Sequence, residues 1–238
     1  MNRLILLLLM TLLSGSLFAQ RPERLRNDLY IGVSGGAHLS TVDFVPRILQ
    51  TQRFGVQSGV AAKFVSNQLT ESGSVLAGVI AELNFSQRGW TEDFDQERHP
   101  GFAYSRALNY IDLPIMTHLN AGTGNVRFIF NVGPQISFLL SDASSMSQAL
   151  ADHLVEHPIS PRFGMQYLPF EYMRRIDYGI IGGMGVQLRT PIGHFDLEGR
   201  YFVGLGDVFE SRRSRNAHFS RSAHRVMQVR LTYYMRIN

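Results

Sequence analysis

The chain has 238 residues, of which 45% are hydrophobic and 18% are charged, and its formal net charge is +4. This balance excludes an intrinsically disordered chain. The scattered arginines exclude the basic helix or stripe expected of a nucleic-acid-binding protein. Cysteine is absent, which excludes disulfides, thiolate metal sites, thiol catalysis and a lipoprotein anchor. The length suits one large all-β domain or two small ones.

The N-terminal stretch contains one basic residue, an apolar run from Leu4 to Leu13, and the sequence "SLFAQ". This arrangement predicts a secretory signal peptide that is cleaved near Ala19 or Gln20. A retained membrane anchor is the alternative, but the apolar run is short for a spanning helix. We therefore expect an exported protein in which residues 1–19 are the signal peptide and residues 20–238 form the domain.

Eight runs of alternating apolar residues follow, and turn-rich segments separate them. They begin near Leu29, Arg53, Ser74, Arg106, Asn125, Arg175, Gly193 and Ala223. Several runs reach the 9–11 residues with which a tilted strand crosses a bilayer. Strands of soluble proteins average five or six residues, so length favours a membrane barrel over a soluble periplasmic sandwich.

The connections between these runs alternate in length. Segments 66–73, 120–125 and 190–193 are short, whereas 41–51, 91–105, 141–173 and 206–222 are long. Outer-membrane barrels have short periplasmic turns and long external loops, and a Greek-key sandwich gives no reason for such regularity. The pattern predicts an all-β fold, an eight-stranded antiparallel up-and-down transmembrane β-barrel with both termini on the periplasmic side.

The two faces of each run differ in kind. In "GHFDLEGRYFVGL" (193–205), Asp196, Glu198 and Arg200 alternate with large apolar residues. The polar faces are rich in Gly, Ser, Asn and Gln, and Lys63 is the only lysine. A solvated face would favour lysine and glutamate, so we assign the polar face to the lumen. Eight strands enclose an interior that side chains can fill, which predicts a filled barrel and not an open channel.

The predicted lumen holds nearly balanced charges. We expect a structural lumen ion network composed of Lys63, Glu82, Arg88, Asp112, Arg127, Asp177, Arg189, Asp196, Glu198, Arg200 and Arg230. Buried ions are tolerated when they are paired and hydrogen-bonded, and arginine binds carboxylates in a bidentate manner. The alternative, a proton or ion path, is favoured by no single residue.

Catalytic and metal-binding patterns are weak. His153 and His157 would ligate a metal only if their segment were helical, and no other ligand motif accompanies them. His218, Ser220 and Ser222 would suit a rim enzyme, but their spacing is not diagnostic. The glycine runs 32–36 and 179–185 precede no helix, so we interpret them as relief of crowding in a small barrel. We expect no enzyme activity, no cofactor and no metal.

The segment 210–225 is rich in arginine and falls in a predicted external loop. Arg212, Arg213, Arg215 and Arg221 are candidate contacts for lipid phosphates or an acidic partner there. Outer-membrane lipid and lipopolysaccharide are the expected surroundings of the barrel. A solvated loop without a ligand is the alternative.

Four stretches in order resemble one protein family. They are "AELNFSQRGW" (81–90), "RALNYIDLPIMTHLN" (106–120), "NVGPQISFLLSD" (131–142) and "DYGIIGGMGVQLRTPIGHFDLEGRYFVGLGDVF" (177–209). Together they are similar to the PorT-like outer-membrane β-barrel proteins of the Bacteroidetes type. The similar features include Gln87-Arg88-Gly89 and the Tyr110-Ile111-Asp112-Leu113-Pro114 run. The chain departs from one outer-membrane pattern because it ends "LTYYMRIN", without a terminal phenylalanine.

The resemblance implies an integral outer-membrane barrel of about eight strands. It also implies a non-enzymatic role in a protein secretion system of the type IX kind, which exports surface proteases, through contact with other secretion-system proteins. The alternative is a structural or adhesin-type barrel that binds ligands through its long external loops. A rim enzyme acting on lipid is a further alternative.

Overall fold

The computed structural model describes residues 27–66, 75–158, 164–209 and 221–237, and the predicted signal peptide lies outside these ranges. Eight long strands dominate it. They are β1 (Asn27–Val45), β3 (Arg53–Ser66), β4 (Val75–Glu92), β5 (Tyr104–Ala121), β6 (Val126–Met146), β7 (Ile176–Thr190), β8 (Gly193–Gly204) and β9 (Arg221–Arg236). A two-residue strand, β2 (Gln50–Thr51), pairs with the end of β4.

The eight long strands form a closed antiparallel ring. Each strand pairs with its neighbour in sequence, β9 pairs with β1, and the ring runs β4-β3-β1-β9-β8-β7-β6-β5 back to β4. The predicted eight-stranded up-and-down barrel is therefore confirmed. Over most of the length that all eight strands share, closure pairs the backbone groups on both sides of each strand, which is what a sheet needs in order to cross a bilayer.

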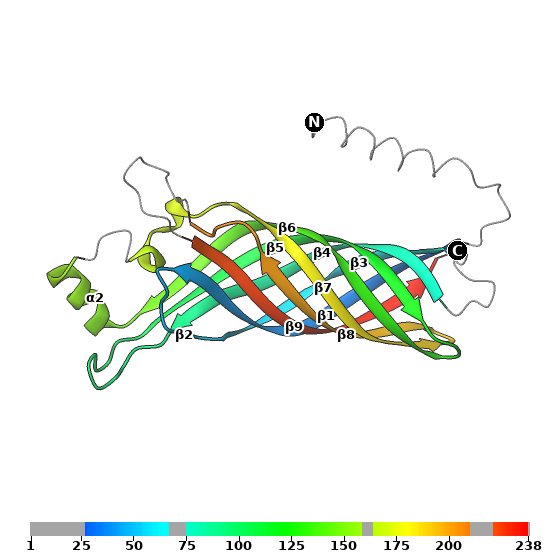
Figure 1. Ribbon diagram of the computed structural model, residues 1–238, viewed down its shortest axis with the longest axis horizontal. Helices are drawn as coiled ribbons and strands as arrows, with labels where there is room; N and C mark the ends of the chain where they lie inside the picture. Colours follow the sequence, from blue (N-terminus) through cyan, green and yellow to red (C-terminus); the bar gives the residue numbers. More distant parts are fainter. Residues whose placement is uncertain (1–26, 67–74, 159–163, 210–220, 238) are drawn as a thin grey trace, which may run out of the picture.

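Figure 1 shows a long barrel of tilted strands with its irregular elements gathered at one end. That end carries helix α2 (Gln148–Glu156) and two 3₁₀ turns, η1 (Met165–Tyr167) and η2 (Phe170–Tyr172). The C-terminus lies at the opposite end, beside the short connections. Short turns lie on the periplasmic side in bacterial barrels, so α2 marks the external end. In the described ranges, no helix has the length and apolarity to cross a membrane.

A band of large apolar side chains covers the outside of the barrel from its periplasmic end to about its middle. On β6, Phe128 and Phe130 point outward, and on β8 Leu197 and Tyr201 do the same. Their partners in the alternation, such as Asn131 and Glu198, are buried in the lumen. The face assignments made from the period-two pattern hold on both strands.

Towards the external end the alternation changes its sense. On β1, Thr41 and Asp43 point outward, while Val42 and Phe44 are buried inside. On the outer surface there, Asp43 pairs with Arg225 of β9 at 3.5 Å. Apolar residues now lie inside and polar ones outside, as in a soluble protein. We call this portion the projecting barrel and the apolar-banded portion the embedded barrel.

A register shift accompanies this change on β5 and β6. Tyr110 pairs with Leu139, but the preceding residue Asn109 pairs with Ser141, so Leu140 is an extra residue. A β-bulge of this kind bends the strand and changes its twist. Beyond the bulge β6 continues as a strand to Met146. The expectation of a loop from residue 141 was therefore wrong for its first six residues, 141–146, because they pair with β5.

Candidate functional site

The centre of the lumen is organised around Glu82 of β4. Its carboxylate accepts two hydrogen bonds from Arg200, each 3.0 Å long, and one of 2.6 Å from Arg230. Arg200 also donates to Glu198 at 2.6 Å, and Glu198 accepts from Asn131 of β6, two strands away. Each buried charge at this level therefore faces an opposite charge, as buried ions require.

A second group lies on the periplasmic side of Glu82. The Lys63 ammonium donates to Asp196 at 2.8 Å and sits 3.7 Å from the centroid of the Tyr234 ring. Gln187 donates to the other Asp196 oxygen at 2.8 Å. The only lysine of the chain is 1% exposed, so an ion pair, a ring face and a closed wall surround its charge.

A third group lies on the external side. Arg88 contacts Asp112 at 2.6 Å and Asp177 at 3.8 Å. Its guanidinium also lies over the rings of Phe202 and Tyr110, with distances of 4.7 and 5.1 Å to their centroids. These three groups together form what we call the lumen network. Its members are Lys63, Glu82, Arg88, Asp112, Asp177, Asp196, Glu198, Arg200 and Arg230.

Glycines in the barrel wall leave the space that these side chains fill. A Cβ at Gly183 would lie 2.5 Å from Cγ of Arg200, and a Cβ at Gly36 would lie 2.9 Å from Cβ of Arg230. Close approach of a neighbouring side chain is a common reason for glycine within a strand. We interpreted the glycine runs as relief of crowding. At these two positions the crowding side chains are those of Arg200 and Arg230.

An apolar cluster closes the lumen at the external end. We call it the external cap, and its wall residues include Phe44, Trp90, Leu108, Val208 and Phe209. The Trp90 ring meets Phe44 and Phe209 edge-on, at centroid distances of 5.2 and 6.1 Å. The segment between β6 and β7 completes the cap with Leu150, Met165 and Met173. Apolar side chains, and not ion pairs, therefore close the projecting barrel.

Polar contacts hold that segment in place. Arg106 donates to the Leu168 carbonyl at 2.6 Å and to Asp142 at 2.6 Å. The Tyr167 hydroxyl donates to Glu92 at 2.7 Å. Burial raises the pKa of Tyr167, and the hydrogen bond to Glu92 raises it further, so the hydroxyl keeps its proton. The described part of the segment is therefore fastened to the rim of β4 and β5.

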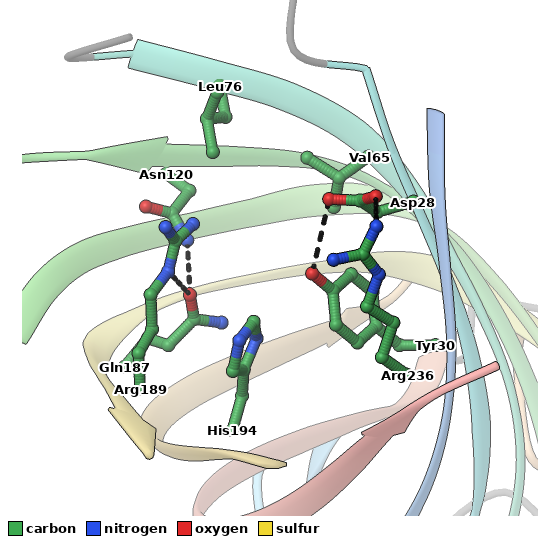
Figure 2. A pocket seen from close by; sticks show the side chains of 9 residues that line it. All are labelled: Asp28, Tyr30, Val65, Leu76, Asn120, Gln187, Arg189, His194 and Arg236. Atoms are coloured by element: carbon green, nitrogen blue, oxygen red, sulfur yellow. Dashed lines mark hydrogen bonds and ion pairs between the residues drawn. The ribbon is translucent and has the colours of Figure 1, made fainter. Parts of the chain in front are cut away.

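The periplasmic mouth is polar and hollow. A pocket of about 300 Å³ opens there, and residues of seven strands line it (Figure 2). Arg189, Gln187 and Asn120 form one side, while Asp28 and Arg236 form another. We call this hollow the periplasmic pocket. The Lys63 group of the lumen network lies next to it, because Tyr30 both lines the pocket and contacts Lys63 with its ring.

The structure brings together nine of the eleven residues assigned to the ion network. Arg189 lies towards the periplasmic end and meets the network through Gln187, which also donates to Asp196. Arg189 donates through Nε to Gln187 at 3.2 Å and meets no carboxylate in the described ranges. Arg127 lies beside it, in register with Gln187. The period-two pattern identified both as inward residues, but it carries no information on depth along the lumen.

The structure describes only some of the remaining candidate residues. Arg212, Arg213, Arg215, His218 and Ser220 lie outside the described residues. Arg221 is at the start of β9, on the projecting barrel.

Two other candidates have structural surroundings. Ser222 is 1% exposed and its Oγ accepts from the Phe209 amide at 3.1 Å, which places it in the cap. His153 and His157 stack on α2 with centroids 4.8 Å apart. Over the described ranges, no group of three or more His, Cys, Asp or Glu side chains has the geometry to hold a metal ion.

Two features escaped the sequence analysis. The external cap is not predicted, because its residues lie in strand ends and loops, and the sequence analysis assigns the apolar face to the outside along the whole of each strand. The Arg106–Asp142 pair, 2.6 Å apart, was missed because Asp142 follows the bulge. The sequence does contain a signal for the cap. Val42 and Phe44 alternate with the polar residues Thr41 and Asp43, in the reverse sense to the rest of the strand.

Fold and filled lumen together define an integral outer-membrane β-barrel. The chain belongs to the family described as outer membrane protein beta-barrel domain, whose model matches residues 18–210. The protein is thus located in the outer membrane, in contact with its lipids. A search of the curated proteins finds no match.

Solved outer-membrane barrels are similar in fold. The attachment invasion locus protein Ail of Yersinia pestis is 12% identical, covering 87% of this chain and 98% of its own, with a TM-score of 0.37. OprG of Pseudomonas aeruginosa is 9% identical, covering 87% and 96%, with a TM-score of 0.43. The outer-membrane protease OmpT of Escherichia coli is 9% identical, covering 90% and 96%, with a TM-score of 0.34.

Proposed function

We propose that this protein acts by contact with other proteins, as a non-enzymatic component or assembly factor of a type IX-like protein secretion system. The observation that carries the proposal is the filled lumen. The lumen network occupies the middle of the barrel, and the external cap closes one end. A barrel filled in this way transports nothing through its centre, so its exposed surfaces are what remains for function.

The projecting barrel supplies such a surface. Strands continue past the apolar band, and the described part of the β6–β7 segment is fastened to them by Arg106 and Tyr167. An ordered rim can bind a partner without a large cost of ordering on association. The resemblance of segments 81–90, 106–120 and 177–209 to PorT-like barrels supports a secretion partner.

Deletion of the gene tests this function. We expect the loss of secreted surface proteases from the medium and cell surface, with membrane integrity and lipid A profiles unchanged. Co-purification from outer membranes should then recover secretion-system proteins. Normal protease secretion in the deletion strain would contradict the proposal.

A matched pair of variants makes the deletion test specific. Complementation with Arg106→Leu, which releases the Leu168 and Asp142 contacts, should restore barrel insertion but reduce secretion. Complementation with Arg98→Leu, an exposed arginine of another external loop, should restore both. Equal secretion by the two strains would show that the fastened segment is not the contact surface.

A second function is favoured by a groove on the projecting barrel. This groove has a volume of about 550 Å³, and Arg47, Leu49, Gln50 and Arg225 are among its lining residues. Exposed apolar and cationic groups side by side suit an adhesin-type barrel that binds an envelope or host ligand. Reduced attachment of an Arg47→Ala strain, with protease secretion intact, would favour this function over the first.

A further inference from the structure

The periplasmic pocket is built from two polar groups that face each other across the mouth of the barrel (Figure 2). In the first group, Arg236 donates to Asp28 at 2.5 Å, and the Tyr30 hydroxyl lies 3.5 Å from the other Asp28 oxygen. The carboxylate and the guanidinium neutralise each other. This side of the pocket therefore presents a polar wall with no net charge.

The second group is not neutralised. Arg189 through Nε and Asn120 through Nδ2 donate to the same Gln187 oxygen, at 3.2 and 2.7 Å. In the described ranges, the two Nη groups of Arg189 have no hydrogen-bond acceptor and no carboxylate. All four cations of the lumen network, by contrast, have a carboxylate within 4 Å. Arg189 thus leaves positive charge directed into the pocket.

The four network cations are Lys63, Arg88, Arg200 and Arg230, and each has its carboxylate partner within the network. In the pocket itself, Arg236 is paired with Asp28. Arg189 differs from all of them.

Two further atoms of the pocket lack partners in the described part of the chain. Asn120 is only 2% exposed, yet its Oδ1 accepts no hydrogen bond. The Nδ1 atom of His194, which lies between the two groups in Figure 2, is buried without a partner. Buried polar atoms are nearly always hydrogen-bonded. A forked cation, an acceptor and an imidazole therefore line one small pocket with bonding capacity to spare.

We propose that the periplasmic pocket binds a small oxyanion that also carries a hydrogen-bond donor, such as a hydroxycarboxylate or dihydrogen phosphate. The Arg189 fork matches two oxygens of such an anion, and Asn120 Oδ1 accepts its hydroxyl.

The size of the pocket limits the ligand. A volume of about 300 Å³ corresponds to roughly ten water molecules, at about 30 Å³ each in the liquid. A molecule of several non-hydrogen atoms fits, and a sugar chain or a folded domain does not. The pocket has no outlet through the barrel, because the lumen network and the external cap lie beyond it. Binding and release both occur from the periplasmic side.

The test uses the full-length protein in detergent micelles and ligand-observed NMR with glycolate and inorganic phosphate as probes. Arg189→Gln should weaken binding of both probes at least about tenfold, since it removes a charge-assisted fork. Arg98→Gln removes the same charge from an exposed external loop and should leave binding unchanged. Heat-modifiable migration on gels verifies that both variants are folded.

Asn120→Leu provides a second, independent measurement. The wild-type protein should prefer glycolate to acetate, because only glycolate has a hydroxyl for Asn120 Oδ1, and this preference should disappear in the variant. Failure of the wild-type protein to bind either glycolate or phosphate at millimolar concentration would overturn the proposal. Equal binding by wild type and Arg189→Gln would overturn it as well. Protease secretion is not a readout here, so the outcome is separate from that of the proposed function.

Discussion

The embedded barrel and the projecting barrel are made from the same eight strands, yet they are filled by opposite chemistry. In the embedded barrel, large apolar side chains such as Phe130 point outward and charges such as Glu82 lie inside. In the projecting barrel, Asp43 points outward, and Phe44 and Trp90 lie inside. The antiparallel pairing continues through both regions, apart from the bulge in β6. What differs is the solvent outside the wall.

This difference shows that the sense of a period-two pattern reports the medium that surrounds a barrel. Lipid outside favours apolar outward residues and leaves the polar set for the lumen. Water outside reverses both preferences. A strand of 21 residues such as β6, about twice the 9–11 residues that span a bilayer, has room for both senses. Four predictions test the contrast, from the largest expected effect to the smallest.

Glu82→Leu should produce the largest loss, because it leaves Arg200 and Arg230 with less compensating charge inside the embedded barrel. Removing one partner of a buried ion pair costs about 3–5 kcal/mol of unfolding free energy. Urea titration in detergent, read by gel migration, measures it. The control is Asp95→Asn, whose partner Arg98 is largely exposed, and its cost should be about 0–1 kcal/mol. Similar losses of unfolding free energy for the two variants would contradict a structural role of the lumen network.

Leu197→Arg should cost about 2–4 kcal/mol, as expected for a charge on the lipid-facing side near the middle of a bilayer. Ala143→Arg, also outward but on the projecting barrel beyond the bulge, should have little effect. Unfolding titrations of both variants in phospholipid give the comparison. An equally large loss for Ala143→Arg would place lipid, not water, outside the projecting barrel.

Gly183→Val should cost about 1–3 kcal/mol, the usual penalty for overpacking, since a Cβ there would lie 2.5 Å from the Arg200 side chain. Gly199→Val on the outer face is the matched control, because nothing lies within 4 Å of the Cβ position. Thermal unfolding of the two variants distinguishes crowding in the lumen from a general effect of valine. If the control loses as much stability, crowding is not the cause.

Tyr167→Phe should have the smallest effect, about 0.5–1.5 kcal/mol, the net contribution of one hydrogen bond. The bond to Glu92 needs a protonated hydroxyl, and burial raises the pKa of Tyr167. The contribution is therefore complete below the ordinary tyrosine pKa of about 10 and is lost as pH rises above it. Limited proteolysis of the β6–β7 segment in wild type and variant measures the difference. A difference that persisted at strongly alkaline pH would argue against this bond.

The fold was largely predictable from the sequence. Period two, strand length and alternating connections identified eight strands and their faces, because these features depend on local geometry and on lipid. The partners within the lumen were not predictable, since Glu82 meets Arg200 and Arg230 across the ring and period two carries no information on such pairing. The cap escaped because Val42 and Phe44 follow the reverse sense. The periplasmic pocket depends on which charge lacks a partner, which only the assembled barrel reveals.

The reversal of sense between the two regions is tested most directly by spin labels in this naturally cysteine-free chain. Single cysteines at Phe130 and Leu197 in the embedded barrel, and at Ala143 and Asp43 in the projecting barrel, would be labelled in lipid bilayers. Electron paramagnetic resonance then compares relaxation by oxygen, which partitions into lipid, with relaxation by a water-soluble nickel complex. The first pair should respond to oxygen and the second pair to nickel. Oxygen-dominated relaxation at Ala143 and Asp43 would contradict the account.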